Sequence, residues 1–289
     1  MTTTTFDWTP VAPSWSRHRA HVEQMKGALT RELLAALDLQ PGQRVLELGA
    51  GTGDLARRLA RAVGPTGSVF ATDVAEGMDE LLRDAATWLP NVEVARLDAV
   101  DIDAPDASVD AVVFRMGLMF VAEPGRVLAE CRRVLTPTGR LALAVWAGPE
   151  HNPWLASVGM SVMMHGLWAG APPTSPGGVF SMSDPAVLER LVRDAGFTDV
   201  AVQEVATPAR FNSPEEHFEV VSGLAGPLSA ALVGADDDSL AAIRATTAQA
   251  VDRFRTADGL VVPGLALLCT ASSDGGKSDR QPEVAALRS

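Results

Sequence analysis

A glycine-rich turn is the part of this sequence whose residue types and spacing are best suited to chemistry. Gly49, Gly51 and Gly53 stand at alternate positions after the apolar segment 45–48, and a helical pattern follows over 54–60. Glycines allow a ligand to approach the backbone closely and permit positive φ angles. The start of the helix offers free N–H groups and a positive dipole end to an anionic group. The pattern predicts the opening of a nucleotide-binding strand–turn–helix–strand unit.

The spacing of this turn distinguishes between two classes of ligand. The dinucleotide fingerprint Gly-x-Gly-x-x-Gly would need a glycine at position 54, where the sequence has Asp54. Glu47 lies inside the preceding strand, where a carboxylate would repel a pyrophosphate but tolerate an ammonium or a sulfonium. An NAD-dependent oxidoreductase is therefore a disfavoured rival.

Two further acids stand where predicted strands end. Asp73 follows the strand 68–72, and Asp98 follows the strand 92–97. A carboxylate at the end of the second strand can accept hydrogen bonds from both hydroxyls of a ribose. The alternatives are that Asp73 only caps the next helix and that Asp98 is an ordinary turn residue.

The stretch ELGAGTG at 47–53, taken with ATDVAEGM at 71–78, resembles the class I S-adenosylmethionine-dependent methyltransferases. Within them it is most similar to the quinone-biosynthesis-like and small-molecule branch. The resemblance is good over roughly residues 30–150 and looser elsewhere. It implies S-adenosylmethionine as cofactor, S-adenosylhomocysteine as product, and ribose binding by Asp73.

The resemblance also implies a set of cofactor-binding residues around the glycine turn and the ends of strands two, three and four. They are Glu47, Gly49, Ala50, Gly51, Asp73, Val74, Met78, Asp98, Ala99 and Arg115. Asp98 would accept from the adenine amino group, and Met78 either packs near the adenine or belongs to the core. Arg115 is unusual near a cation, so its side chain points away, pairs with Glu47 or pairs with the carboxylate of the cofactor.

Strands and helices alternate from residue 44 to residue 146, which predicts five parallel strands with helices between them. The resemblance extends this to an α/β, Rossmann-like, seven-stranded and mostly parallel sheet with helices on both faces, plus helical lid insertions. Its last strand, 265–270, would lie antiparallel between strands five and six.

We expect a single domain made of consecutive segments with different roles. They are an N-terminal arm and helix covering the cofactor site (1–40), the cofactor-binding core (41–150), a lid insertion (151–183), a continuation of the core (184–211), a helical lid insertion (212–258), the last strand (259–271) and a disordered tail (272–289).

The acceptor should lie at the carboxyl end of strand four, because open α/β sheets bind ligands at that edge. Methionine and aromatic residues gather there and in the lid segments, which suits an apolar acceptor; the alternative is that they only pack in the core. The candidate pocket residues are Trp15, Met116, Met119, Phe120, Trp154, Met164 and Trp168.

The sequence assigns no catalytic residue. Methyl transfer needs a nucleophile held in line with the methyl group, and a base only where the acceptor must lose a proton. His151 and His165 are weak candidates for that base, the alternative being surface or packed histidines. Two cysteines, Cys131 and Cys269, are too few for a cysteine zinc site, and we predict no metal.

Composition limits the classes of partner. The net charge of −12 and the absence of a lysine and arginine cluster argue against nucleic acid. The sequence has no apolar run of membrane-spanning length and no basic, apolar leader at residue 1, so we expect a cytoplasmic protein. A homodimer is compatible with the resemblance.

These observations predict an enzyme that transfers a methyl group from S-adenosylmethionine to an O, N or C nucleophile of an apolar small molecule. Transfer would rest mainly on proximity and orientation. The acceptor would be an aromatic or polyketide-like compound of secondary metabolism, with a quinone precursor and a fatty acid as open alternatives. The alternative is a protein with the methyltransferase fold that binds the cofactor without methylating and has a binding, regulatory or rearrangement role.

Overall fold

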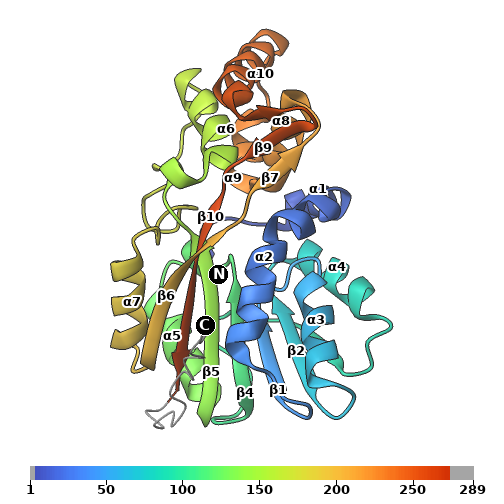
Figure 1. Ribbon diagram of the computed structural model, residues 1–289, viewed down its shortest axis with the longest axis vertical. Helices are drawn as coiled ribbons and strands as arrows, with labels where there is room; N and C mark the ends of the chain where they lie inside the picture. Colours follow the sequence, from blue (N-terminus) through green and yellow to red (C-terminus); the bar gives the residue numbers. More distant parts are fainter. Residues whose placement is uncertain (1–3, 274–289) are drawn as a thin grey trace, which may run out of the picture.

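The structure is a computed structural model that describes residues 4–273. From residue 274 onward, the predicted disordered tail lies outside the described residues. Figure 1 shows a sheet surrounded by helices in the lower half of the molecule, and a second group of helices and short strands above it.

The lower half is built on a seven-stranded sheet in the order β3-β2-β1-β4-β5-β10-β6. β10 runs antiparallel to both of its neighbours, and the other pairs are parallel. This arrangement confirms the predicted Rossmann-like sheet. The strands are β1 (Arg44–Leu48), β2 (Ser68–Asp73), β3 (Val92–Arg96), β4 (Val109–Arg115), β5 (Leu135–Trp146), β6 (Thr198–Ala206) and β10 (Leu265–Ser272).

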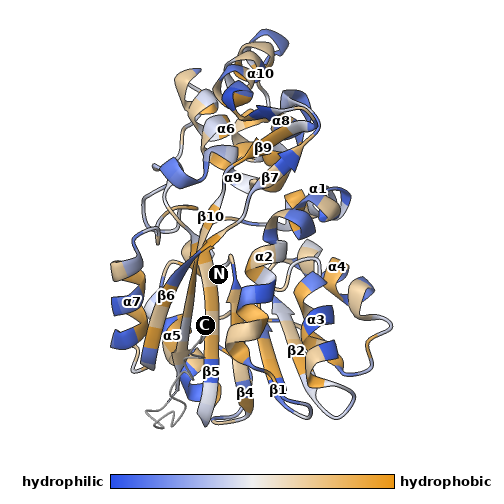
Figure 2. Ribbon diagram, viewed as in Figure 1, coloured by the Kyte–Doolittle hydropathy of each residue, from blue (hydrophilic) through white to orange (hydrophobic). Residues whose placement is uncertain are grey.

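Five helices pack around this sheet. They are α2 (Arg19–Leu37), α3 (Asp54–Val63), α4 (Glu76–Ala86), α5 (Pro124–Val134) and α7 (Pro185–Asp194). β4 reads as a nearly continuous apolar run because it lies in the middle of the sheet, and its residues 111–114 are at most 5% exposed. Figure 2 shows the apolar strands in the interior and polar residues on the outer faces of helices such as α7.

The upper half, which we call the cover, lies above the carboxyl edge of the parallel strands (Figure 1). Its helices are α6 (Pro153–Met164), α8 (Pro214–Leu224), α9 (Gly226–Leu232) and α10 (Asp237–Val251). Its strands form a second sheet in the order β7-β9-β8, made of β7 (Ala209–Phe211), β8 (Arg255–Thr256) and β9 (Gly259–Val262).

This small sheet differs from the sequence prediction in two ways. The segment 212–258, expected to be helical, ends in β8, and the segment 259–271, expected to be one strand, is two strands. Pro263 and Gly264 separate β9, which pairs with β7, from β10, which pairs with β5. β7 and β8 are only three and two residues long, so no alternating pattern could reveal them.

Residues 4–17 of the N-terminal arm are partly helical. They contain the 3-10 helix η1 (Thr9–Val11) and α1 (Ala12–Arg17). Each begins with a proline, Pro10 and Pro13, in its first turn, where a missing N–H costs nothing. Further single 3-10 turns are η2 (Leu118–Phe120), η3 (Pro149–His151) and η4 (Asp252–Phe254).

Asn152 fixes the point at which the chain leaves the sheet for the cover. Its side chain is fully buried, and Nδ2 donates to the carbonyl oxygens of Ala147 and Leu265, each at 2.9 Å. Its Oδ1 accepts from the N–H of Leu265 at 3.0 Å and from Trp154 Nε1 at 3.2 Å. One amide thus joins the end of β5, the start of β10 and the start of α6.

Within residues 4–273, none of the helices combines the length and the apolar character that crossing a membrane requires.

Candidate functional site

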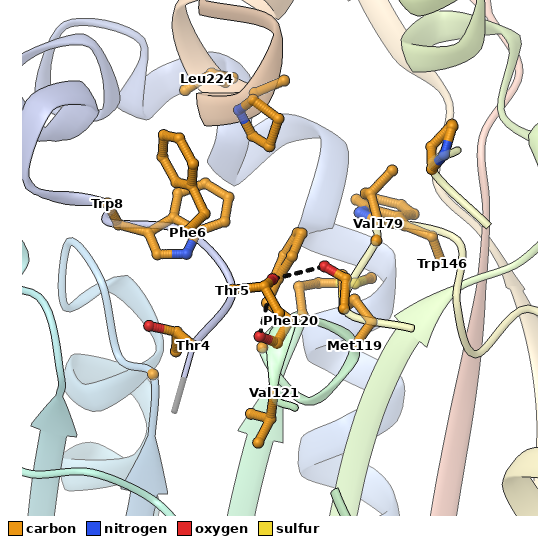
Figure 3. A pocket seen from close by; sticks show the side chains of 18 of the residues that line it. Thr4, Thr5, Phe6, Trp8, Met119, Phe120, Val121, Trp146, Val179 and Leu224 are labelled. Atoms are coloured by element: carbon orange, nitrogen blue, oxygen red, sulfur yellow. Dashed lines mark hydrogen bonds between the residues drawn. The ribbon is translucent and has the colours of Figure 1, made fainter. Parts of the chain in front are cut away.

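A cavity of about 590 Å³ lies between the carboxyl edge of the sheet and the cover, within the usual size range of small-molecule sites. Its floor is the loop after β1 and the ends of β2 and β4, and its upper walls are α6, α9 and the loop 168–180. The segment 4–15, which belongs to the N-terminal arm, contributes a further wall of the cavity (Figure 3).

The glycine turn has the conformation that its composition predicts. Gly49, Gly51 and Gly53 all have positive φ angles, of 61°, 57° and 75°. A Cβ built at Gly51 would meet nothing within 4 Å, so its requirement for glycine is conformational and the space beside it is open to a ligand. α3 begins directly after the turn.

Asp73 holds this turn in place from the end of β2. Its Oδ2 accepts from the N–H of Gly51 at 2.9 Å, and its Oδ1 accepts from the N–H of Ala75 at 3.0 Å. Burial raises the pKa of Asp73, and the N–H groups of Ala75 and Gly51 oppose that shift. Because a carboxylate oxygen can accept more than one hydrogen bond, Asp73 can brace the turn and still bind a diol in the cavity.

Nine of the ten cofactor-binding residues predicted from the sequence line the cavity. They are Gly49, Ala50, Gly51, Asp73, Val74, Met78, Asp98, Ala99 and Arg115. The tenth, Glu47, lies behind this wall on β1 and is 2% exposed, and its Oε2 has no hydrogen-bond partner among the described residues.

The charge state of Glu47 should make stability depend on pH. Burial raises the pKa of Glu47 from 4.5 to about 8, against the lowering effect of Arg115. Across that interval the native protein keeps a proton that the unfolded chain has lost, so Glu47 lowers the free energy of unfolding as pH rises. We expect Glu47→Gln to remove this dependence, so that the stability difference between variant and wild type grows from about pH 5 to about pH 8 and then levels off.

Urea denaturation across this pH range measures the effect. Glu80→Gln, at an exposed position of α4, is the matched control and should show a small difference at every pH. A Glu47→Gln difference that stays constant with pH would mean that this carboxyl group titrates alike in the folded and unfolded chain.

Arg115 pairs with Asp54, an alternative that the sequence did not suggest. Its Nη2 donates to Asp54 Oδ1 at 2.7 Å, and its Nη1 donates to Thr30 Oγ1 at 2.7 Å. Although burial alone would raise the pKa of Asp54, the charge and hydrogen bond of Arg115 lower it below the usual value. The residue that replaces the third glycine of the dinucleotide fingerprint is therefore half of a buried ion pair.

Lys26 is a cavity residue that sequence reasoning missed. It lies on α2 and is 6% exposed, and burial together with the charge of Arg115 lowers its pKa from 10.5 to about 7. The sequence does contain a weak indication of burial. Lys26 stands four residues after Val22 and beside Met25, so it shares the apolar face of the helix.

Six of the seven predicted acceptor-pocket residues also line the cavity: Trp15, Met116, Met119, Phe120, Trp154 and Trp168. Met164 is the exception, because it is the last residue of α6 and is 69% exposed to solvent. Met160 and Met163 of the same helix line the cavity in its place.

The N-terminal arm is hydrogen-bonded to three distant segments of the chain. Thr5 Oγ1 donates to the carbonyl oxygens of Gly177 at 2.7 Å and Phe120 at 3.2 Å (Figure 3). Farther along the arm, Trp15 Nε1 donates to the carbonyl oxygen of Leu224 in α8 at 3.0 Å. Trp8 packs edge-on against Phe120, with ring centroids 4.8 Å apart.

The structure does not bring either histidine candidate to the cavity. His151 is exposed on η3, with Nε2 3.5 Å from Glu150 Oε1. His165 is exposed at the end of α6, with Nε2 3.0 Å from Thr246 Oγ1. Among the described residues no histidine lines the cavity, and no cluster of histidine, cysteine, aspartate or glutamate could hold a metal ion.

Comparison with known proteins relates this chain to a protein family. A model of the methyltransferase domain matches residues 46–143. The chain is similar to the ubiquinone/menaquinone biosynthesis C-methyltransferase UbiE of Ralstonia pickettii, 36% identical over 164 residues, covering 49% of this chain and 66% of the relative. UbiE of Teredinibacter turnerae is 36% identical over 117 residues, which cover 39% of this chain and 47% of the relative.

A third relative, an uncharacterized 37.1 kDa protein in transposon TN4556 of Streptomyces fradiae, is 41% identical over 111 residues, covering 38% of this chain and 32% of the relative. The chain thus spans between 32% and 66% of the length of these three curated relatives.

Solved structures share the fold. An S-adenosylmethionine-dependent methyltransferase from Aquifex aeolicus has a TM-score of 0.51 and 25% identity, covering 70% of this chain and 93% of the other. The [4+2]-cyclase SpnF has a TM-score of 0.54 and 19% identity, and the match covers 95% of this chain and 100% of the other. The match over residues 46–143, the sheet order and the glycine turn agree: the chain carries the methyltransferase domain of the class I S-adenosylmethionine-dependent methyltransferases.

Proposed function

We propose that this protein transfers a methyl group from S-adenosylmethionine to an O, N or C nucleophile of an apolar small molecule. One observation carries the proposal: a single cavity has the glycine turn and Asp73 at one end and aromatic and methionine side chains of the cover at the other. A polar nucleoside and an apolar acceptor can therefore meet in one enclosed space.

The residues at the polar end fit the nucleoside part of the cofactor. Asp73 has acceptor capacity left for the ribose hydroxyls, and Gly51 leaves open space beside the turn. Val74, Met78, Asp98 and Ala99 would surround the adenine; Met78 is buried against the N-terminal helices. When bound, the cofactor supplies the electrophilic methyl group.

The apolar end orients the acceptor and excludes water. Trp154 and Trp168 come from the cover, Trp15 from the arm, and Met119 and Phe120 from η2. With no histidine lining the described part of the cavity, this chain acts mainly by holding the acceptor nucleophile close to the methyl group in a dry site.

Cofactor binding without methylation is the weaker proposal. Two of the three curated relatives described above are named as C-methyltransferases, which supports transfer. The likeness to a cyclase is at 19% identity and bears on the fold alone.

We further propose an aromatic or polyketide-like metabolite of secondary metabolism as the acceptor, in preference to nucleic acid. The aromatic wall of the cavity and the net charge of −12 support this choice. The buried, unpaired thiols of Cys131 and Cys269 fit a reducing compartment such as the cytoplasm. A homodimer and the segment boundaries given above stay predictions.

Calorimetric and thermal-shift titration with S-adenosylhomocysteine tests the proposal. Ligand at 100 times its dissociation constant should add about 2.7 kcal/mol to the free energy of unfolding. NAD⁺ is the control ligand and should give no shift, because Asp54 replaces the third glycine of its fingerprint. Transfer of a labelled methyl group across a panel of aromatic acceptors then follows. Absence of any response to S-adenosylhomocysteine would contradict the proposed function.

A further inference from the structure

We propose that Lys26 is the residue that binds the carboxylate at the amino-acid end of the cofactor. This inference rests on the proposed function and adds a subsite to it. The nucleoside end is assigned to Asp73 and its neighbours, whereas Arg115, the cation that the sequence offered for the anionic end, is paired with Asp54.

Lys26 is a buried basic residue that has no anionic partner among the described residues. Its side chain lines the cavity, and within residues 4–273 no carboxylate lies within ion-pair distance of its ammonium. Its contact is a ring: Nζ lies 4.8 Å from the centroid of the Trp15 indole. A cation–π contact offsets only part of the cost of burying an ammonium, so the site is favourable for an anion.

The other cation that lines the described part of the cavity, Arg115, is already satisfied. Arg115 donates to Asp54 and to Thr30, each at 2.7 Å, and Thr30 Oγ1 itself donates to the carbonyl oxygen of Lys26 at 2.8 Å. Arg115 thus occupies the carboxylate of Asp54, and Lys26 lines the cavity. In the unliganded protein, burial and then Arg115 lower the pKa of Lys26, with Asp54 opposing them; an anionic ligand group would restore its charge.

The position of α2 favours the cofactor over the acceptor as the source of the anion. Arg19 Nη2, two helical turns before Lys26, donates to the carbonyl oxygen of Thr52 in the glycine turn at 3.2 Å. Asp54, whose charge acts on Lys26, is the first residue after that turn. Lys26 therefore lies between the glycine turn and Trp15, which belongs to the apolar end, whereas Trp154 and Trp168 come from the cover.

Two ligands that differ only at the amino-acid end distinguish carboxylate binding by Lys26 from a structural role of this residue. S-adenosylhomocysteine carries the carboxylate, and 5′-methylthioadenosine has the same nucleoside and thioether without it. We expect Lys26→Met to weaken S-adenosylhomocysteine binding about 10- to 100-fold in calorimetry and to leave 5′-methylthioadenosine unchanged. Lys26→Arg keeps the positive charge and should recover much of the lost affinity. Arg31→Met, which removes a cation from the exposed face of α2, is the control and should bind both ligands as wild type does.

The remaining outcomes each overturn the inference. Equal weakening of both ligands by Lys26→Met would show a structural role, and Lys26→Arg without recovery would show that charge is not what matters. Unchanged S-adenosylhomocysteine binding with a raised acceptor KM would place the anion on the acceptor. Failure of the wild type to bind either ligand would overturn the proposed function itself, which separates the two failures.

Discussion

Replacing Asp73 by alanine is expected to weaken S-adenosylhomocysteine binding by at least about 100-fold. The carboxylate accepts from the N–H of Gly51 and the N–H of Ala75, so its removal leaves two buried donors unpaired and frees the glycine turn. It also removes the acceptors that we propose for the ribose hydroxyls. Calorimetry with S-adenosylhomocysteine measures the loss, and thermal unfolding without ligand reports any loss of stability.

A second substitution separates the two roles of this side chain. Asp73→Asn keeps one oxygen for the turn but loses charge and half of the acceptors, and it should lie between wild type and alanine in affinity. Asp84→Ala removes a carboxylate from the exposed face of the neighbouring helix α4 and should leave binding unchanged. Wild-type affinity in Asp73→Ala would refute the assignment of the nucleoside to this end of the cavity.

Replacing Arg115 by methionine is expected to lower the free energy of unfolding by about 3–5 kcal/mol. The guanidinium and the carboxylate of Asp54 are 7% and 5% exposed and 2.7 Å apart, so the substitution leaves an uncompensated buried charge. Urea denaturation at pH 7 measures the change. Because Asp54 is held in its charged form by Arg115, the isolated carboxyl group should also titrate at a higher pH in the variant.

The double variant Arg115→Met/Asp54→Leu tests the cause. Removing both charges should restore a large part of the stability, since two apolar side chains can replace a buried ion pair at little net cost. Arg193→Met, which removes one partner of the exposed Glu189–Arg193 pair, should cost less than about 1 kcal/mol. A double variant no more stable than Arg115→Met would mean that volume, and not charge, decides stability here.

The sheet could be predicted from the sequence because its signals are local and long enough to read. β1 and β4 are mostly apolar runs, and the glycine turn marks one helix start unambiguously. The strand–turn–helix–strand pattern located Asp73 at the end of the second strand, and the other cavity-lining residues around it were implied by the resemblance to the methyltransferases.

The parts that could not be predicted depend on contacts between distant segments. β7 and β8 are too short to carry a pattern, and β9 becomes a strand only by pairing with them. The partner of Arg115 stands 61 residues away along the chain, and sequence spacing gives no hint of it. Lys26 was overlooked because its significance lies in what surrounds it: an indole, a satisfied ion pair and an open space.

The arm that closes the cavity has a consequence for the order in which this protein becomes functional. Thr5 is synthesised before the segments that it contacts, yet its hydroxyl group bonds to the backbone of residues 120 and 177, and Trp15 bonds to residue 224. The arm must therefore wait for these later segments to be made before it can dock. A nascent or truncated chain can form its central strands and still lack a closed cavity, so the ability to retain a ligand reports that the whole chain has folded.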